Sequence, residues 1–354
     1  MRLLRVELTQ VGPFEAVSLS LGEGAARAST VIHGAGGVGK TSLLLAIGNT
    51  RPGAVSAILS PALVDRRSQF PTEAERLPSA VTYWSLGQDD RERQHPLCLA
   101  SPSTRVCADD VQEVARRREQ TVFDRVAKEG GFAYLAIPSS RWFSAQPLAL
   151  NAPLRTLARY DVRGSLSFEE RHDLGRETKQ ALAYAGIASA LQSSGRPSGV
   201  DFKLLDGGMR HAVNSVVRLL GYRYEGLDPQ SFEPHFAGPY RELISFDALP
   251  TAVRHLVAFA ALPVRTLWGA YPGRDPRLAE AVVSVDEPEL HQDAATRAGL
   301  VEALESALPC VQWLLATASP EIAASVDTSA VVALRRTDER VGVELFSGFE
   351  ARTH

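Results

Sequence analysis

Alternating apolar and polar residues open the chain and predict two antiparallel strands. LLRVELTQ (3–10) and AVSLSLG (16–22) carry a hydrophobic residue at nearly every second position, which is the period of a strand with one buried face. A short apolar run, STVIHG (29–34), predicts a buried strand. KTSLLLAIGN (40–49) follows it and predicts a helix that ends at Gly48-Asn49.

Further along, the pattern switches between the periods of strands and helices. AVTYWSLG (80–87) and PLCLAS (96–101) predict a strand pair, residues 108–131 predict a helix, and FAYLAIP (132–138) predicts a buried strand. Residues 150–222 have a mostly helical pattern that breaks at SSGRPSG and lacks the sustained heptads of a long coiled coil.

The last third of the chain returns to alternating strands and helices. A helix is predicted to begin at Pro250-Thr251, and an apolar strand ends in the acids of AEAVVSVDEPELHQ. RAGLVEALESAL predicts a helix, and VQWLLATASP, AVVALRRT and VGVELFSG predict strands. We therefore predict an α/β core of residues 1–100 and 236–354. A mainly helical insert of residues 101–235 splits it and serves as a lid, a dimer arm or a platform for a partner.

Composition and charge narrow the function classes. The 354 residues include 45% hydrophobic and 22% charged residues, which is typical of a globular protein. A net charge of −3 gives no general footprint for nucleic acid, although a local basic patch stays open. Three scattered cysteines have no metal-ligand spacing, and no signal peptide or membrane span is indicated. We expect a soluble, cytoplasmic protein without membrane contact.

One glycine-rich stretch carries the strongest chemical signal. Residues 34–41 read GAGGVGKT, the G-x-x-x-x-G-K-T pattern of a phosphate-binding loop between a strand and a helix. Backbone N–H groups and the helix N-terminus would hold phosphate. Lys40 would pair with the β- and γ-phosphates, and Thr41 would ligate Mg²⁺. The predicted nucleotide-binding residues are Gly34, Ala35, Gly36, Gly37, Val38, Gly39, Lys40, Thr41 and Ser42.

A second motif, VVSVDEPELH, delivers two acids to the end of an apolar strand. Ligands bind at the carboxyl ends of parallel strands in α/β sheets. Asp286 is therefore a candidate Mg²⁺ ligand, as a Walker-B aspartate is. Glu287, one residue further on, is a candidate general base that polarises the attacking water. Glu287 and Lys40 are the predicted catalytic residues.

These motifs resemble those of ABC-type ATPase heads such as RecF, SMC and overcoming-lysogenization-defect proteins. DEPELH resembles their Walker-B segment, residues 2–21 resemble their N-terminal strand pair, and TASPE (317–321) resembles their T-H-S-P-E strand end. The resemblance covers roughly residues 1–48 and 240–330. It implies a P-loop NTPase fold of the ABC-head type with an inserted mainly helical subdomain. STAND ATPases share GGVGKT but usually lack DEPELH, and ParA-type ATPases carry a lysine at the position of Ala35.

Three departures from the family pattern bear on turnover. The family histidine that contacts the γ-phosphate is replaced by Ala318. The signature motif L-S-S-G-E has its best match in LPTAVRH (249–255), where Pro250 and Ala252 replace a serine and a glycine. Gln88 is a weak candidate for the glutamine loop. Because losing one electrostatic contact to a transition state typically costs about 10²–10³ in rate, we expect slow hydrolysis.

Other residues support smaller predictions. The arginine run in residues 115–120 could contact the phosphate backbone of a nucleic acid, although such a run is usually a solvent-exposed face of a helix. Arg141 could reach the nucleotide or form a structural ion pair. His255 and His291 lie near the motifs, but isolated histidines are more often structural residues than ligands or bases. Trp142 and Trp268 are predicted to lie in the core.

The resemblance implies an ATP- and Mg²⁺-dependent switch. Relatives act in DNA repair or anti-phage defence, often with an effector such as a nuclease supplied by another protein. We therefore expect a homodimer or higher oligomer with a protein partner. The alternative is a nucleotide-stabilised scaffold or sensor without turnover, which Ala318 and Ala252 favour.

Overall fold

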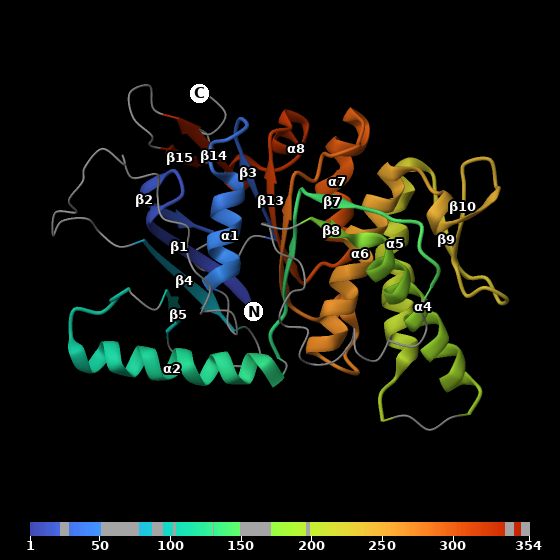
Figure 1. Cartoon of the computed structure of the whole chain (residues 1–354), viewed down its shortest axis with the longest axis horizontal. Coiled ribbons are helices and arrows are strands. Elements are labelled where there is room, and N and C mark those ends of the chain that lie inside the picture. The colour runs from blue at the N-terminus through green and yellow to red at the C-terminus, as the bar shows by residue number, and fades with distance from the viewer. Residues whose placement is uncertain are drawn as a thin grey trace.

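A six-stranded sheet, five strands of which run parallel, forms the centre of the described structure (Figure 1). The computed structural model describes residues 1–21, 28–50, 78–86, 95–101, 104–129, 131–148, 171–195, 199–336 and 343–347. The strand order is β15-β14-β3-β13-β12-β6. The strands are β3 (Ser29–His33), β6 (Tyr134–Ile137), β12 (Ala281–Asp286), β13 (Val311–Thr317), β14 (Val331–Arg336) and the antiparallel β15 (Val343–Ser347).

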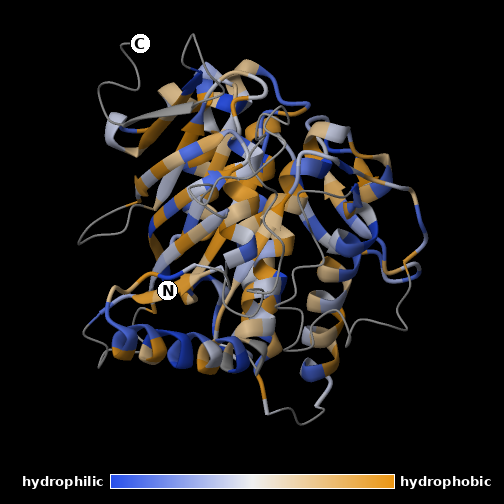
Figure 2. Ribbon diagram, turned by 60° about the vertical axis from the view of Figure 1, so that its left-hand side comes forward, coloured by the Kyte–Doolittle hydropathy of each residue, from blue (hydrophilic) through white to orange (hydrophobic). Residues whose placement is uncertain are grey.

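Neighbouring residues on the central strands belong to two different hydrophobic cores. In β12, Val282 packs with the N-terminal strands and the first helix, whereas Val283 packs with the helices on the opposite face. Leu314 and Leu315 of β13 divide in the same way. Because side chains alternate across a strand, a sheet that is covered on both faces needs apolar residues at consecutive positions, as the orange strands of Figure 2 show.

The N-terminal strands build a second sheet on one face of the first. Its order is β2-β1-β4-β5, formed by β1 (Arg2–Val11), β2 (Phe14–Ser20), β4 (Ser79–Ser85) and β5 (Leu97–Ala100), all antiparallel. Helix α1 (Lys40–Thr50) packs with this sheet in one core. The buried side chain of Gln312 bonds to both the N–H and the C=O of Leu3 and so joins β13 to β1.

Helices cover the other face. They are α4 (Leu174–Ser193), α5 (Phe202–Val217), α6 (Thr251–Ala270) and α7 (Ala294–Ala307), and they share a core with the parallel strands. Beside them lie the three-stranded sheet of β9 (Arg223–Leu227), β10 (Pro234–Ala237) and β11 (Leu243–Ser245), and the short pair of β7 (Arg141–Trp142) and β8 (His172–Asp173). The remaining elements are α2 (Asp110–Glu129), α8 (Pro320–Ala324) and the 3-10 helices Arg218–Leu220, Phe246–Ala248, Pro276–Leu278 and Thr328–Ala330.

Most predicted elements are present, with three differences. The first helix runs on to Thr50, so Gly48-Asn49 does not end it, because tertiary packing overrides the weak helix propensity of these residues. The small β9–β11 sheet was not predicted. Its strands are short, and one pairing is irregular between His235 and Phe236.

The third difference concerns the predicted insert. β6 lies within residues 101–235, yet it pairs in parallel with β12 at the edge of the main sheet. The segment therefore contributes a strand to the core as well as helices outside it. The division into core and insert otherwise stays a prediction. None of the helices in the described ranges combines the length and apolar character that crossing a bilayer requires.

Candidate nucleotide-binding site

The glycine loop lies between β3 and α1, at the carboxyl end of the parallel strands. Gly37 and Gly39 have positive φ angles of 75° and 98°, which L-residues with side chains rarely adopt. A Cβ on Gly39 would lie 2.4 Å from the Pro13 ring in the turn between β1 and β2. The loop therefore needs glycine both for its conformation and for its close approach to the neighbouring turn.

Lys40 lies over the loop that precedes it. Its ammonium donates hydrogen bonds to the carbonyl oxygens of Gly34 and Ala35, each 2.8 Å long. The residue is 7% exposed, so the charge is held against the loop rather than in bulk solvent. Thr41 and Ser42 follow in the first turn of α1, and Ser42 lies beneath Gly12 of the β1–β2 turn.

Three oxygen-bearing side chains meet at the end of β12. One carboxylate oxygen of Asp286, Oδ2, accepts hydrogen bonds from Thr41 Oγ1 at 2.8 Å and from Ser139 Oγ at 3.0 Å. The other, Oδ1, is buried without a hydrogen-bond partner among the described residues. Burial raises the pKa of the Asp286 carboxyl, against the hydrogen bonds from Thr41 and Ser139.

This arrangement fits a magnesium ion. Mg²⁺ prefers oxygen ligands and is usually held by one or two carboxylates together with substrate phosphates. Asp286 Oδ1 is a buried acceptor that an ion would satisfy, and Thr41 lies beside it as predicted from the loop motif. In the described ranges, no three His, Cys, Asp or Glu side chains gather into a metal-binding cluster. The candidate magnesium site therefore supplies a single carboxylate, that of Asp286, together with hydroxyl groups.

Ser139 was missed by sequence reasoning. It follows β6, the neighbour of β12 in the sheet, so both strands end at the same edge. The sequence feature that could have identified Ser139 is the apolar run 132–138 directly before a hydroxyl residue. This feature points to Asp286 only when β6 is known to pair with β12. Gln88, the candidate for the glutamine loop, lies outside the described residues.

Glu287 directly follows β12 in a strained conformation. Its φ is 49°, an uncommon angle for a residue with a side chain, and its N–H donates to Ala316 O at 2.8 Å. Burial first, and then the charges of Asp286 and Glu289, raise the pKa of the Glu287 carboxyl. A raised pKa brings a carboxylate closer to the working range of a general base.

The segment after β13 carries no side chain that could sense a phosphate at position 318. The N–H of Ala318 donates to Glu289 Oε1 at 2.8 Å, and Ser319 caps α8 through its hydroxyl. His33, at the end of β3, makes a hydrogen bond with the Ala318 backbone, and its pKa is lowered, chiefly by burial. An imidazole therefore does lie close to Ala318, but it comes from β3.

A pocket of about 800 Å³ opens along the loop on the side of β14 and α8. His33, Gly34 and Gly36 line it together with Arg335 and Arg336 of β14. Arg336 also donates to Gly37 O at 3.0 Å. The pocket volume is within the usual range of small-molecule sites. The two arginines that line the pocket make one side of it cationic, which suits an anionic ligand.

The histidines and tryptophans singled out in the sequence have different surroundings. His255 is 1% exposed and stacks on His291 with ring centroids 5.0 Å apart. Burial lowers the pKa of His255 to about 3, so the ring is neutral and packed. Trp268 is buried at 4% as predicted, but Trp142 is 49% exposed and its assignment to the core was wrong. It follows Arg141 in a two-residue strand that leaves its side chain outside.

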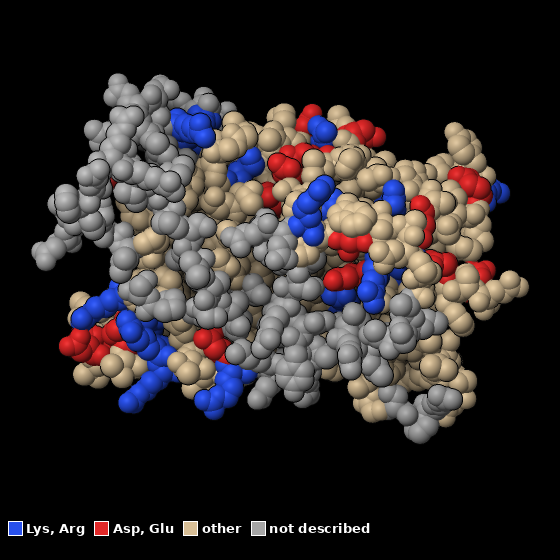
Figure 3. All heavy atoms as spheres, in the orientation of Figure 1, with Lys and Arg blue, Asp and Glu red and all other residues tan. Residues whose placement is uncertain are grey.

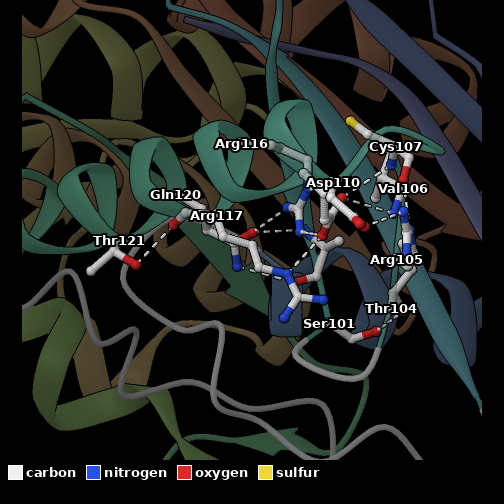
Figure 4. Close-up of polar contacts among 12 residues, drawn as sticks. Ser101, Thr104, Arg105, Val106, Cys107, Asp110, Arg116, Arg117, Gln120 and Thr121 are labelled. Carbon is white, nitrogen blue, oxygen red and sulfur yellow. Dashed lines mark hydrogen bonds and ion pairs between the residues drawn. The ribbon is translucent and has the colours of Figure 1, made fainter.

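The arginine run of residues 115–120 is mostly committed to contacts within the protein. Glu113 accepts hydrogen bonds from Arg116 and from Arg117, and Arg116 also bonds to Gln120 (Figure 4). Arg116 is 8% exposed. Figure 3 shows side chains of both charges over α2 at the lower left rather than a stripe of one sign. These contacts do not support a nucleic-acid interface on this helix.

The segment that matches the family signature begins α6. The helix starts at Thr251 after Pro250, as the sequence predicted. The carbonyl of Ala252 accepts from Gln292 Nε2 at 3.1 Å, which connects this turn to the segment that follows Glu287. The three cysteines are free.

Comparison with known proteins identifies the fold. No protein-family model matches the sequence, and no curated protein matches it. One solved structure, an SMC head bound to the C-terminal winged-helix domain of ScpA, has 13% identity and a TM-score of 0.52, over 99% of this chain and 98% of that chain. A Pyrococcus furiosus SMC head domain with an extended coiled coil, bound to the C-terminal domain of ScpA, has 13% identity and a TM-score of 0.51, over 98% and 96%.

The chain has the fold of an SMC head domain. This confirms the predicted α/β fold of the ABC-type P-loop ATPases. The agreement with the predicted resemblance is one of fold, and it does not extend to the overcoming-lysogenization-defect proteins. In the SMC-head fold of this chain, the glycine loop, Asp286 and Glu287 occupy one edge of the sheet.

Proposed function

We propose that this chain binds ATP with Mg²⁺, hydrolyses it slowly and uses the nucleotide as a switch for association. The observation that carries the proposal is the convergence of Thr41, Ser139 and Asp286 on one side of the glycine loop. A glycine turn without a binding function would not be expected to place a hydroxyl at hydrogen-bond distance from a buried acid at the end of β12, as Thr41 is from Asp286. The SMC-head fold supports the same activity.

Each residue has a role in this proposal. The loop amides and Lys40 hold the phosphates, which compete with the Gly34 and Ala35 carbonyls for the ammonium. Thr41 and Asp286 hold the metal, and Ser139 orients the Asp286 carboxylate. The chemistry that Mg²⁺ supplies when bound is neutralisation of charge on the phosphate oxygens. Glu287 accepts a proton from the water that attacks the terminal phosphorus as the bond to the ADP oxygen breaks.

Replacement of Lys40 tests nucleotide binding. We expect Lys40→Ala to lose detectable ATP·Mg²⁺ binding in isothermal titration calorimetry, because each hydrogen bond to a charged group contributes about 1.5–3 kcal/mol. Lys203→Ala removes an exposed lysine from α5 and is the matched control. Equal ATP binding by the wild type and Lys40→Ala would show that the proposal is wrong.

A second candidate is a nucleotide-stabilised scaffold or sensor. Ala318 favours it, since no side chain at that position can couple the γ-phosphate to Glu287. Glu287→Gln separates the two candidates. In an ATPase this variant loses phosphate release and retains ATP, whereas in a scaffold it changes nothing because the wild type already releases no phosphate.

The proposal also covers the pathway and the partner. We propose that the switch acts in DNA repair or anti-phage defence and that it controls a separate effector protein. Two SMC heads of the same fold were crystallised with domains of ScpA, which supports a protein partner rather than a free-standing enzyme. Proteins that co-purify with the chain only when ATP is present would identify that partner.

A further inference from the structure

Arg141 makes an unusual set of contacts beside Glu287. Its guanidinium donates to three main-chain carbonyls, those of Pro138, Asp286 and Glu287, each at 2.7 Å. The residue is 8% exposed. It forms none of the ion pairs found among the described residues. Arg141 therefore forms no salt bridge with the described residues, and it does not line the pocket beside the glycine loop.

The carbonyls of Asp286 and Glu287 lie at the end of β12, where the backbone enters a strained turn. Glu287 holds a φ of 49°, and such a conformation costs of order 1–3 kcal/mol unless the surroundings impose it. The Glu287 N–H is fixed on one side by Ala316 O, and its carbonyl is fixed on the other by Arg141 Nη2. The planar fork of a guanidinium suits two neighbouring acceptors, which an ammonium cannot match.

We propose that Arg141 is a positioning residue that fixes the backbone of Glu287 and thereby aims its carboxyl at the attacking water. The inference rests on the proposed ATPase function. It assigns a part in catalysis to a side chain that touches neither phosphate nor metal.

Two contacts outside the strained turn set the position of the guanidinium itself. Its carbon lies 5.1 Å from the centroid of the Phe259 ring in α6, and Nη1 is also held by Pro138 O beyond the end of β6. The fork is thus anchored on one strand end and one helix while it reaches the end of β12. Although burial lowers the pKa of Arg141 to about 10, the group stays charged at neutral pH.

The test compares Arg141→Met and Arg141→Lys with the wild type. Single-turnover ATP hydrolysis is measured at neutral pH, and ATP·Mg²⁺ affinity is measured separately by calorimetry. Arg265→Met is the matched control, because Arg265 is similarly buried, with 7% of it exposed, and donates to Glu177 of α4 instead of to the end of β12. Melting temperatures of all variants report loss of folding.

For Arg141→Met we expect a loss of about 10²-fold in rate, as for a misplaced catalytic group, with ATP affinity retained. Arg141→Lys keeps the charge and loses the fork, so its rate also falls while its ATP affinity stays near that of the wild type. Arg265→Met keeps both the rate and the ATP affinity of the wild type. If Arg141→Met is too unstable to measure, the Arg141→Lys rate decides.

Three results would overturn the inference. A wild-type rate in Arg141→Lys shows that the fork is not needed. A wild type that binds ATP without turnover removes the role of Glu287 and leaves nucleotide binding intact. A wild type that does not bind ATP overturns the proposed function itself, and the inference falls with it.

Discussion

At the scale of single residues, Asp286, the proposed metal ligand, has a cost in stability. It is 1% exposed and burial raises its pKa, so the folded protein holds the carboxyl proton more tightly than the unfolded chain does. A group with a raised pKa contributes stability below its unfolded value, and that contribution is lost as pH rises through the folded value. At neutral pH without Mg²⁺, the Asp286 charge therefore destabilises the fold.

We expect Asp286→Asn to differ from the wild type in its pH dependence. In Mg²⁺-free buffer, the wild type should gain unfolding free energy relative to the variant as pH falls from neutral into the range of the raised pKa. Urea unfolding followed by circular dichroism at pH 7.5 and pH 5 measures this difference. An unchanged difference between the two pH values would contradict the assignment.

Asp293 provides a control of opposite sign. It caps α7 by accepting from the Thr296 N–H at 2.7 Å, and this hydrogen bond lowers its pKa. Its contribution to stability is present at neutral pH and is lost as pH falls. Asp293→Ala should therefore keep its difference from the wild type between pH 7.5 and pH 5, and approach the wild type only below the unfolded pKa of an aspartate, about 3.9.

At the scale of elements, α2 depends on one buried carboxylate, because several of its apolar side chains, Val111, Val114 and Val122, are exposed. Glu113 is 6% exposed and accepts from Arg116 and Arg117 and from the N–H groups of Val106 and Cys107. The hydrogen bond from Arg116 is the largest influence that lowers the pKa of Glu113 far below its usual range. Gln120 then bonds to both the N–H and the C=O of Ala100, which holds α2 against β5.

Loss of this carboxylate should destabilise the helix. We expect Glu113→Ala to lower the unfolding free energy by about 3–5 kcal/mol, because it leaves the buried Arg116 without its ion-pair partner. Arg118→Gln removes an exposed charge from the same helix and should change it by less than about 0.5 kcal/mol. Urea unfolding measures both. A Glu113→Ala loss no larger than that of Arg118→Gln would contradict the structural role.

The sequence predicts elements and motifs better than it predicts side-chain partners. The central strands were predicted because burial on both faces requires consecutive apolar residues, as at Val282 and Val283. Ser139 and Arg141 were not assigned their roles, because a residue beyond a strand end can point to several neighbours. Only the pairing of β6 with β12 decides which neighbour it meets. The three-stranded sheet was missed for a different reason, since its short strands bury few residues.

At the scale of the whole molecule, the fold joins every element of the site to the core. β3, β12 and β6 each end at the same edge of the main sheet, and α6 reaches that edge through Gln292 and Phe259. The start of α6 is the best match in this chain to the signature motif of the ABC-type heads that it resembles. The proposed switch therefore predicts that nucleotide binding changes the association of the chain.

The oligomeric state should follow the nucleotide. We expect Glu287→Gln with ATP·Mg²⁺ to double its mass in size-exclusion chromatography with light scattering, because ATP is retained and the switch stays closed. The wild type should show a smaller shift, since slow hydrolysis releases it. Lys40→Ala should keep the mass of the nucleotide-free protein, because it cannot hold phosphate.

A constant mass for Glu287→Gln, with ATP binding intact, would favour the scaffold over the switch. Pro250 and Ala252, at the start of α6, are then the residues that best explain why the nucleotide is bound without a partner subunit closing over it.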